Sequence, residues 1–159
     1  MQMSVQEKNL SFNNIDEILQ FAIEKEEEAR TFYELWSQKV KKQSIKEVLL
    51  EFAVEEQKHK ELLLNVKAGR DFNQPKNQII DLKLGDYFTE VKAHENMTYE
   101  AALRIAIQRE IGAHQLYQYL ASIAENQQIK ELFDRLALEE LKHKMRLENM
   151  YDENFLSEN

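Results

Sequence analysis

Residues 52–60 read Phe-Ala-Val-Glu-Glu-Gln-Lys-His-Lys, and residues 136–144 read Leu-Ala-Leu-Glu-Glu-Leu-Lys-His-Lys. Six of the nine positions are identical, and the offset between the stretches is 136 − 52 = 84 residues. The same offset relates further pairs along the chain: Glu26 and Glu110, Ala29 and Ala113, Tyr33 and Tyr117, Glu47 and Glu131. One shift without a gap therefore aligns the two halves, which indicates an internal duplication.

Each half contains two segments in which apolar residues recur every three or four positions, as on one face of an α-helix. The four segments cover about 14–40, 44–67, 98–124 and 127–151. Ser44 and Glu47 predict a capping box at the start of the second segment, and Thr98 predicts an N-cap for the third. The chain has only 3 Gly and 1 Pro, so long helices are favoured over a fold with many tight turns.

The lengths of the connections predict the topology. A few polar residues join the helices within each half, as in antiparallel hairpins, while about thirty residues separate the halves. We therefore predict a single all-α domain over residues 1–159, a four-helix bundle of two antiparallel hairpins at about 14–67 and 98–151. A long crossover at about 68–97 joins them, as in ferritin-like bundles.

Composition excludes several functional classes. The net charge of −8 disfavours binding to nucleic acid and to a membrane surface. The absence of Cys excludes disulfides, Cys-ligated zinc and iron–sulfur clusters. The N-terminal residues 1–9 lack the apolar core of a signal peptide, and no stretch approaches the ~20 apolar residues of a membrane span. We expect a cytoplasmic protein.

Polar residues interrupt the apolar seam of each helix near its middle, and they form the candidate metal site. They are Glu26, Glu56, His59, Glu110, Glu140 and His143. Each Glu-x-x-His pair has the i,i+3 spacing that turns both side chains to one helix face. A single such pair arises easily on a Glu-rich helix, but two pairs and two further glutamates related by one offset do not. Four carboxylates and two imidazoles suit two iron or manganese ions.

Three more residues lie near this set. Tyr33 and Tyr117 follow Glu26 and Glu110 by seven residues, two turns along the same face. They are either core packing residues or phenols that hydrogen-bond a ligand carboxylate. His114 lies one turn after Glu110, and we expect it to support the site or to lie at the surface rather than to bind metal.

The motifs resemble those of the ferritin-like superfamily and, more narrowly, of the rubrerythrin family. The stretch 26–33, Glu-Glu-Glu-Ala-Arg-Thr-Phe-Tyr, is similar to that family's first-helix motif, and 53–59, Ala-Val-Glu-Glu-Gln-Lys-His, to its second. The resemblance covers about residues 14–151. It implies a centre of two iron ions (or manganese, or a mixed pair) bridged by Glu56 and Glu140. It also implies reaction with peroxide or dioxygen and a homodimer.

Several features depart from the relatives. Rubrerythrins commonly carry a rubredoxin domain with Cys-ligated iron; without Cys, this chain would need a separate electron donor, a rubredoxin-like protein or a reductase. Ala113 stands where rubrerythrins place a further Glu, which weakens a peroxidase assignment. Gln57 replaces the Met that binds haem in bacterioferritin, and no fifth helix is expected for a ferritin cage.

The leading hypothesis is a di-iron carboxylate oxidoreductase that reacts with peroxide or dioxygen in oxidative-stress or iron metabolism. A ferroxidase that oxidises Fe(II) and passes the product on, without cage storage, is the second hypothesis. A structural module that only binds metal is the third, and hydroxylation of an organic substrate the fourth, for which an apolar cavity beside the metals would be needed.

Overall fold

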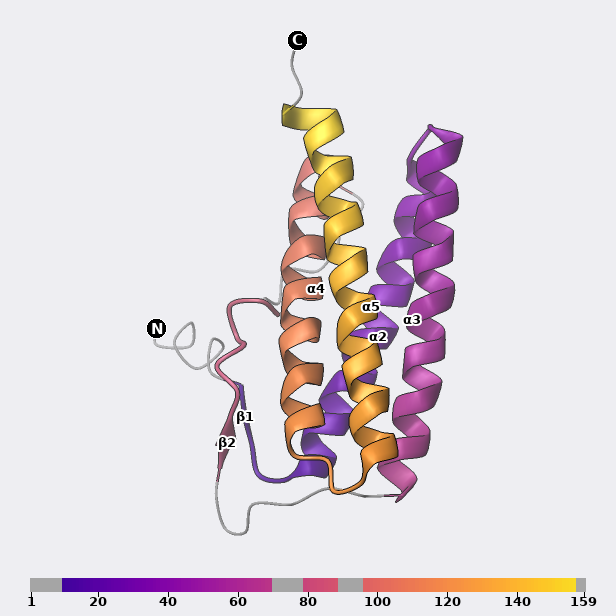
Figure 1. Cartoon of the computed structure of the whole chain (residues 1–159). Coiled ribbons are helices and arrows are strands. Elements are labelled where there is room, and N and C mark those ends of the chain that lie inside the picture. Colours follow the sequence, from indigo (N-terminus) through magenta and orange to yellow (C-terminus); the bar gives the residue numbers. More distant parts are fainter. Residues whose placement is uncertain (1–9, 70–78, 89–95, 157–159) are drawn as a thin grey trace, which may run out of the picture. The chain divides into compact units, whose positions relative to one another are not determined.

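Four long α-helices dominate the computed structural model, which describes residues 10–69, 79–88 and 96–156 (Figure 1). They are α2 (Ile15–Lys39), α3 (Gln43–Gly69), α4 (Tyr99–Ser122) and α5 (Gln127–Tyr151). Two short strands, β1 (Ser11–Phe12) and β2 (Ile80–Asp81), and a π-helical turn, η1 (Asp152–Leu156), complete the described elements. This confirms the predicted all-α class, with four helices as in a four-helix bundle.

The helices pair as two hairpins. Helix α2 packs on α3 and α4 packs on α5, each pair across a link of three or four residues. The chain divides into two compact units, one around α2 and α3 and the other around α4 and α5 with both strands. Of the predicted crossover at about 68–97, the structure describes residues 68–69, 79–88 and 96–97. No helix of the described residues has the length and apolar content of a membrane span.

Side-chain caps fix where three of the helices begin. The side-chain oxygens of three residues each accept a backbone N–H of the first turn: Asn14, Thr98 and Asn126. The cap at Thr98 was predicted, whereas the predicted capping box at Ser44 is wrong. Helix α3 begins at Gln43, so Ser44 lies inside the helix. Glu47 instead accepts a hydrogen bond from the Gln43 side chain at 3.1 Å.

The crossover returns to residues that precede the first hairpin. Strands β1 and β2 pair antiparallel, with Phe12 opposite Ile80, and the Leu82 N–H donates to the Leu10 carbonyl at 3.3 Å. This pairing was not predicted, because strands of two residues are too short to show an alternation of apolar and polar residues.

Farther along, the crossover packs on α4 at a glycine. A Cβ added at Gly112 would lie 2.7 Å from ring carbons of Phe88 and 2.8 Å from Cβ of Tyr87. The repeat equivalent of Gly112 is Glu28 (112 − 84 = 28), which is exposed in the first hairpin. The missing side chain at Gly112 therefore lets the crossover approach the second hairpin closely.

Candidate metal centre

In the first hairpin, α2 and α3 bring together three predicted ligands. His59 Nδ1 lies 3.4 Å from Glu26 Oε2 and 3.2 Å from Glu56 Oε1. One ligand atom from each of the three side chains lies within 4.8 Å of the others, and all three residues are at most 3% exposed. Glu56 and His59 reach the same place because they are three residues apart on α3. We call Glu26, Glu56 and His59 the first triad.

The second hairpin repeats this arrangement with the other three predicted ligands. His143 Nδ1 lies 3.2 Å from Glu110 Oε2 and 3.3 Å from Glu140 Oε1. These side chains also offer ligand atoms within 4.8 Å of one another, and each residue is at most 3% exposed. We call Glu110, Glu140 and His143 the second triad. Two hairpins that fold from different stretches of sequence thus build the same local geometry.

The donor atoms of each triad fit a divalent cation. Each triad holds two carboxylates and one imidazole away from water, and one imidazolium would balance only one of the two negative charges. Uncompensated charge in a protein interior is costly, and a bound dication would compensate both carboxylates. Oxygen-rich ligand sets with one nitrogen suit iron or manganese.

Comparison with known proteins agrees with this geometry. The sequence model of the Rubrerythrin family matches residues 17–100 and 101–159. The chain belongs to the rubrerythrin family. The fold is similar to that of a solved structure titled "Hypothetical Protein Pfu-1136390-001" from Pyrococcus furiosus, with 24% identity, a TM-score of 0.69 and coverage of 86% of this chain and 87% of that one. No curated protein sequence matches.

The two tyrosines that the sequence singled out are buried in the rubrerythrin fold beside aromatic rings. Tyr33 meets Phe52 edge-on at 5.4 Å between ring centroids, and Tyr117 lies 5.9 Å from Phe133. These contacts support the role in core packing. A role of either phenol in catalysis stays a prediction.

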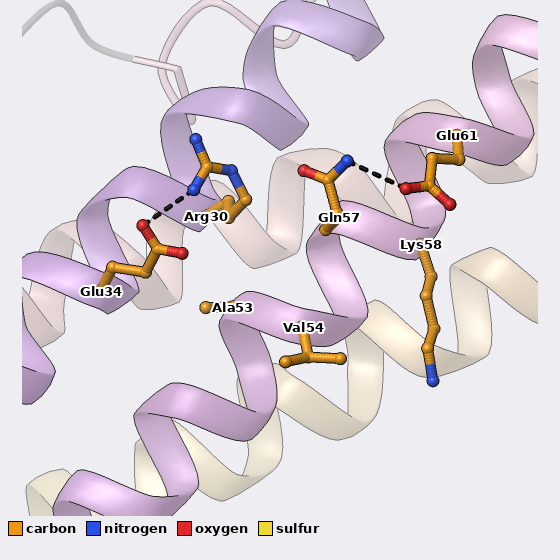
Figure 2. Close-up of a pocket in the computed structure, with 7 residues that line it drawn as sticks. All are labelled: Arg30, Glu34, Ala53, Val54, Gln57, Lys58 and Glu61. Carbon is orange, nitrogen blue, oxygen red and sulfur yellow. Dashed lines mark hydrogen bonds and ion pairs between the residues drawn. The ribbon is translucent and has the colours of Figure 1, made fainter.

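A groove of about 510 Å³ lies on the surface of the first hairpin of this rubrerythrin-family chain (Figure 2). Its lining comes from α2 and α3: Arg30, Glu34, Ala53, Val54, Gln57, Lys58 and Glu61. The rim is charged, with an ion pair of 2.8 Å between Arg30 and Glu34. Neither Glu56 nor His59 lines the groove. The groove is therefore not the apolar cavity beside the metals that hydroxylation of an organic substrate would need.

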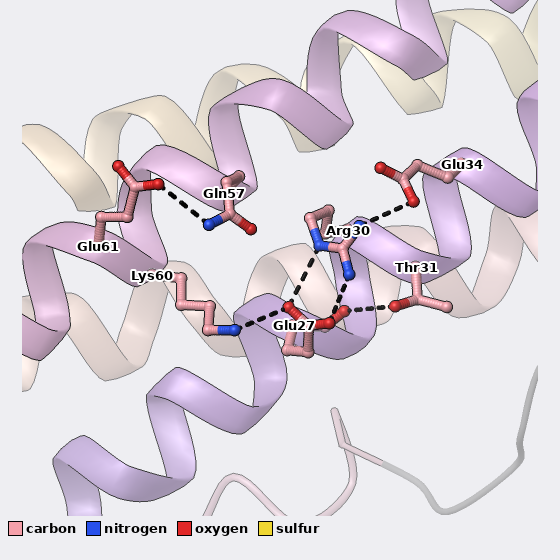
Figure 3. Close-up of polar contacts among 7 residues, drawn as sticks. All are labelled: Glu27, Arg30, Thr31, Glu34, Gln57, Lys60 and Glu61. Carbon is pink, nitrogen blue, oxygen red and sulfur yellow. Dashed lines mark hydrogen bonds and ion pairs between the residues drawn. The ribbon is translucent and has the colours of Figure 1, made fainter.

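Glu27 joins α2 to α3 in an ion-pair cluster (Figure 3). Its carboxylate accepts from Arg30 Nε at 3.2 Å on the same helix and from Lys60 Nζ at 3.0 Å on the opposite one. The register of α2 on α3 explains this contact. Glu27 follows Glu26 and Lys60 follows His59, so a contact between the two ligands brings their neighbours close as well.

The second hairpin has a different contact at the equivalent place. His114 is the repeat mate of Arg30, and its Nδ1 lies 2.7 Å from the backbone carbonyl of Ala137 on α5. The carbonyl can only accept, so Nδ1 carries the hydrogen. His114 is partly buried, and its role in supporting the site stays a prediction.

The cluster around Glu27 predicts an acidic titration. Hydrogen bonds from Arg30 and then Lys60 lower the pKa of Glu27 from 4.5 to about 2. Because the folded-state pKa is the lower one, the stabilisation from the cluster is complete above about pH 4.5 and is lost as the pH falls toward 2. NMR titration of the Glu27 carboxyl carbon should show this midpoint, and Arg30→Met should raise it more than Lys60→Met. A midpoint near 4.5 in the unaltered chain would contradict the cluster.

Proposed function

We propose that this rubrerythrin-family protein binds two metal ions, iron in the first instance, and reacts with peroxide or dioxygen. The observation that carries the proposal is the duplicated triad: the same buried Glu, Glu and His geometry in both hairpins. In this proposal the first and second triads together hold the pair of ions. Manganese or a mixed pair would suit the same ligands.

Each group of side chains has a definable part in this reaction. Iron, when bound, would supply the electrons that reduce the oxidant. Glu26 and Glu110 come from α2 and α4, and the Glu-x-x-His pairs from α3 and α5, so each ion is held from both helices of a hairpin. The buried surroundings exclude bulk water, which strengthens the interaction of the carboxylates with the bound charge.

Other parts of the proposal rest on family likeness and on the composition. A separate electron-donor protein would re-reduce the centre, since the chain has no Cys to hold a second iron site of the rubredoxin kind. A homodimer and a cytoplasmic location belong to the same proposal.

Anaerobic loading with Fe(II), followed by rapid mixing with peroxide or with dioxygen, tests the proposal. We expect two irons per chain, faster oxidation by peroxide and retention of iron through repeated re-reduction. No reaction with either oxidant would contradict the proposed activity and leave a structural role for the metal.

Oxidation of Fe(II) with release of the product is the second candidate function. Ala113 favours it, because this position in α4 lacks the further carboxylate that the peroxidases of the family carry. Faster oxidation by dioxygen than by peroxide, with ferric iron leaving the protein, would select this candidate.

A further inference from the structure

The two triads are identical in residue type but are supported by different contacts between their helices. In the first hairpin, the contact next to the triad is ionic: Glu27 on α2 accepts from Lys60 on α3 at 3.0 Å. In the second, the repeat mate of Glu27 is Ile111, which cannot form an ion pair, and the mate of Lys60 is Lys144. Lys144 instead pairs with Glu148 on its own helix at 3.3 Å.

The ionic contact lies next in sequence to a contact between two candidate ligands. Glu27 directly follows Glu26, and Lys60 directly follows His59, so the ion pair lies beside the 3.4 Å contact between Glu26 and His59. Arg30 holds the Glu27 carboxylate from its own helix, which leaves it fewer rotamers from which to meet Lys60. A shift of α2 along α3 would separate both pairs together.

The contact in the second hairpin is a hydrogen bond to the backbone. His114 follows Glu110 by four residues, about one turn, and Ala137 precedes Glu140 by three. The bond from His114 to the Ala137 carbonyl therefore joins α4 to α5 next to the second triad. Its acceptor carries no charge, so dissolved salt screens it far less than it screens an ion pair.

We propose that Glu27 and Lys60 are positioning residues for the first triad and that His114 is the positioning residue for the second, so the two metal positions are inequivalent. The inference rests on the proposed function, since it concerns how each triad holds its ion. Affinity in the first hairpin depends on the ion pair, and affinity in the second does not.

The size of the effect follows from the exposure of the ion pair. The Glu27 and Lys60 side chains are 39% and 28% exposed, so water and salt weaken their attraction. Exposed pairs of this kind contribute enough to change an equilibrium constant by about two- to fivefold. Screening should remove this contribution between about 0.01 M and 1 M NaCl, where the Debye length falls from about 30 Å to about 3 Å.

The test is anaerobic titration of the full chain with Co(II), followed by visible absorption and calorimetry. His143→Ala leaves the first triad intact and His59→Ala leaves the second, so each position is measured separately. Glu27→Gln is added to both backgrounds. Glu28→Gln is the matched control, because it removes the same charge from the next position, where Glu28 pairs at 3.2 Å with Lys25 on its own helix.

In the His143→Ala background, Glu27→Gln should weaken Co(II) binding about two- to fivefold. Without Glu27→Gln, Co(II) affinity should fall more with added NaCl in the His143→Ala background than in the His59→Ala background. Glu27→Gln should remove this difference. In the latter background Glu27→Gln should change nothing, and Glu28→Gln should change nothing in either. Lys60→Met should have the same effect on Co(II) binding as Glu27→Gln. His114→Phe should weaken Co(II) binding only at the second triad.

Two results would overturn the inference. Equal weakening of both positions by Glu27→Gln would show a general charge effect, and no weakening of either would show that the ion pair does not position the triad. In both cases two bound Co(II) ions per unaltered chain would leave the proposed function standing. Absence of Co(II) binding by the unaltered chain would overturn the proposed function and this inference together.

Discussion

Replacement of both Glu56 and Glu140 by Ala should abolish the tight binding of two metal ions. Each carboxylate belongs to one triad and is 1% exposed. A carboxylate at the protein surface therefore cannot replace it as a metal ligand. Metal analysis after anaerobic Fe(II) loading and gel filtration measures the loss. Thermal denaturation gives a second readout, because an ion present at 100 times its Kd should stabilise the unaltered chain by about 2.7 kcal/mol per site. The double variant should show no such rise in Tm.

The control for this experiment is built into the repeat. Glu55 and Glu139 precede the two ligands in the same Glu-Glu dipeptides, are related by the same offset and lie partly exposed. Glu55→Ala with Glu139→Ala removes the same charge while both triads stay intact, so two ions should still bind. Tight binding of two ions by the Glu56→Ala, Glu140→Ala variant would show that the ligand assignment is wrong.

Gly112→Ala should lower the free energy of unfolding by about 1–3 kcal/mol, the usual result of forcing an extra methyl group into packed side chains. The added Cβ would lie 2.7 Å from the Phe88 ring and 2.8 Å from Tyr87 Cβ, so the crossover must move away from α4. In a chain of this length, each kcal/mol lost should lower Tm by about 2–4 °C. Urea unfolding followed by circular dichroism measures the change directly.

Gly69→Ala is the matched control for this substitution. An added Cβ at Gly69, the last residue of α3, meets nothing within 4 Å. Alanine also has the higher helix propensity, so the change should be neutral or slightly stabilising. Equal stability of the two alanine variants would contradict the close packing of the crossover at Gly112.

The periodic features of the sequence predicted most of the fold and the local grouping of the candidate ligands. Helix faces repeat every 3.6 residues, so long apolar seams reveal four helices. The i,i+3 spacing of Glu56 and His59 predicts a shared face, and the 84-residue offset predicts the same arrangement at Glu140 and His143. Both arrangements are present within their hairpins.

Features that depend on a single contact were not predictable in this way. Glu27 and Lys60 look like other charged residues on a solvated face, and only the register of α2 on α3 shows that they meet. Gly112 lies within α4, where glycine lowers the helix propensity. Only the crossover packed against this position explains why a residue without a side chain is needed there. The helix start at Gln43, one residue before Ser44, is visible only in the backbone, where the Lys42 carbonyl accepts from the N–H groups of Ile45 and Lys46.

The pairing of β1 with β2 also constrains the order in which the chain can fold. Phe12 and Ile80 are 80 − 12 = 68 residues apart, and the whole first hairpin lies between them. Closing a loop of this size costs conformational entropy before the strand contacts repay it, and such long-range contacts slow folding. During synthesis β1 leaves the ribosome first but cannot pair until β2 has emerged. Helices α2 and α3 can pack together as soon as Gly69 has emerged. The strand pair is therefore a late, high-contact-order event that follows a fast local one.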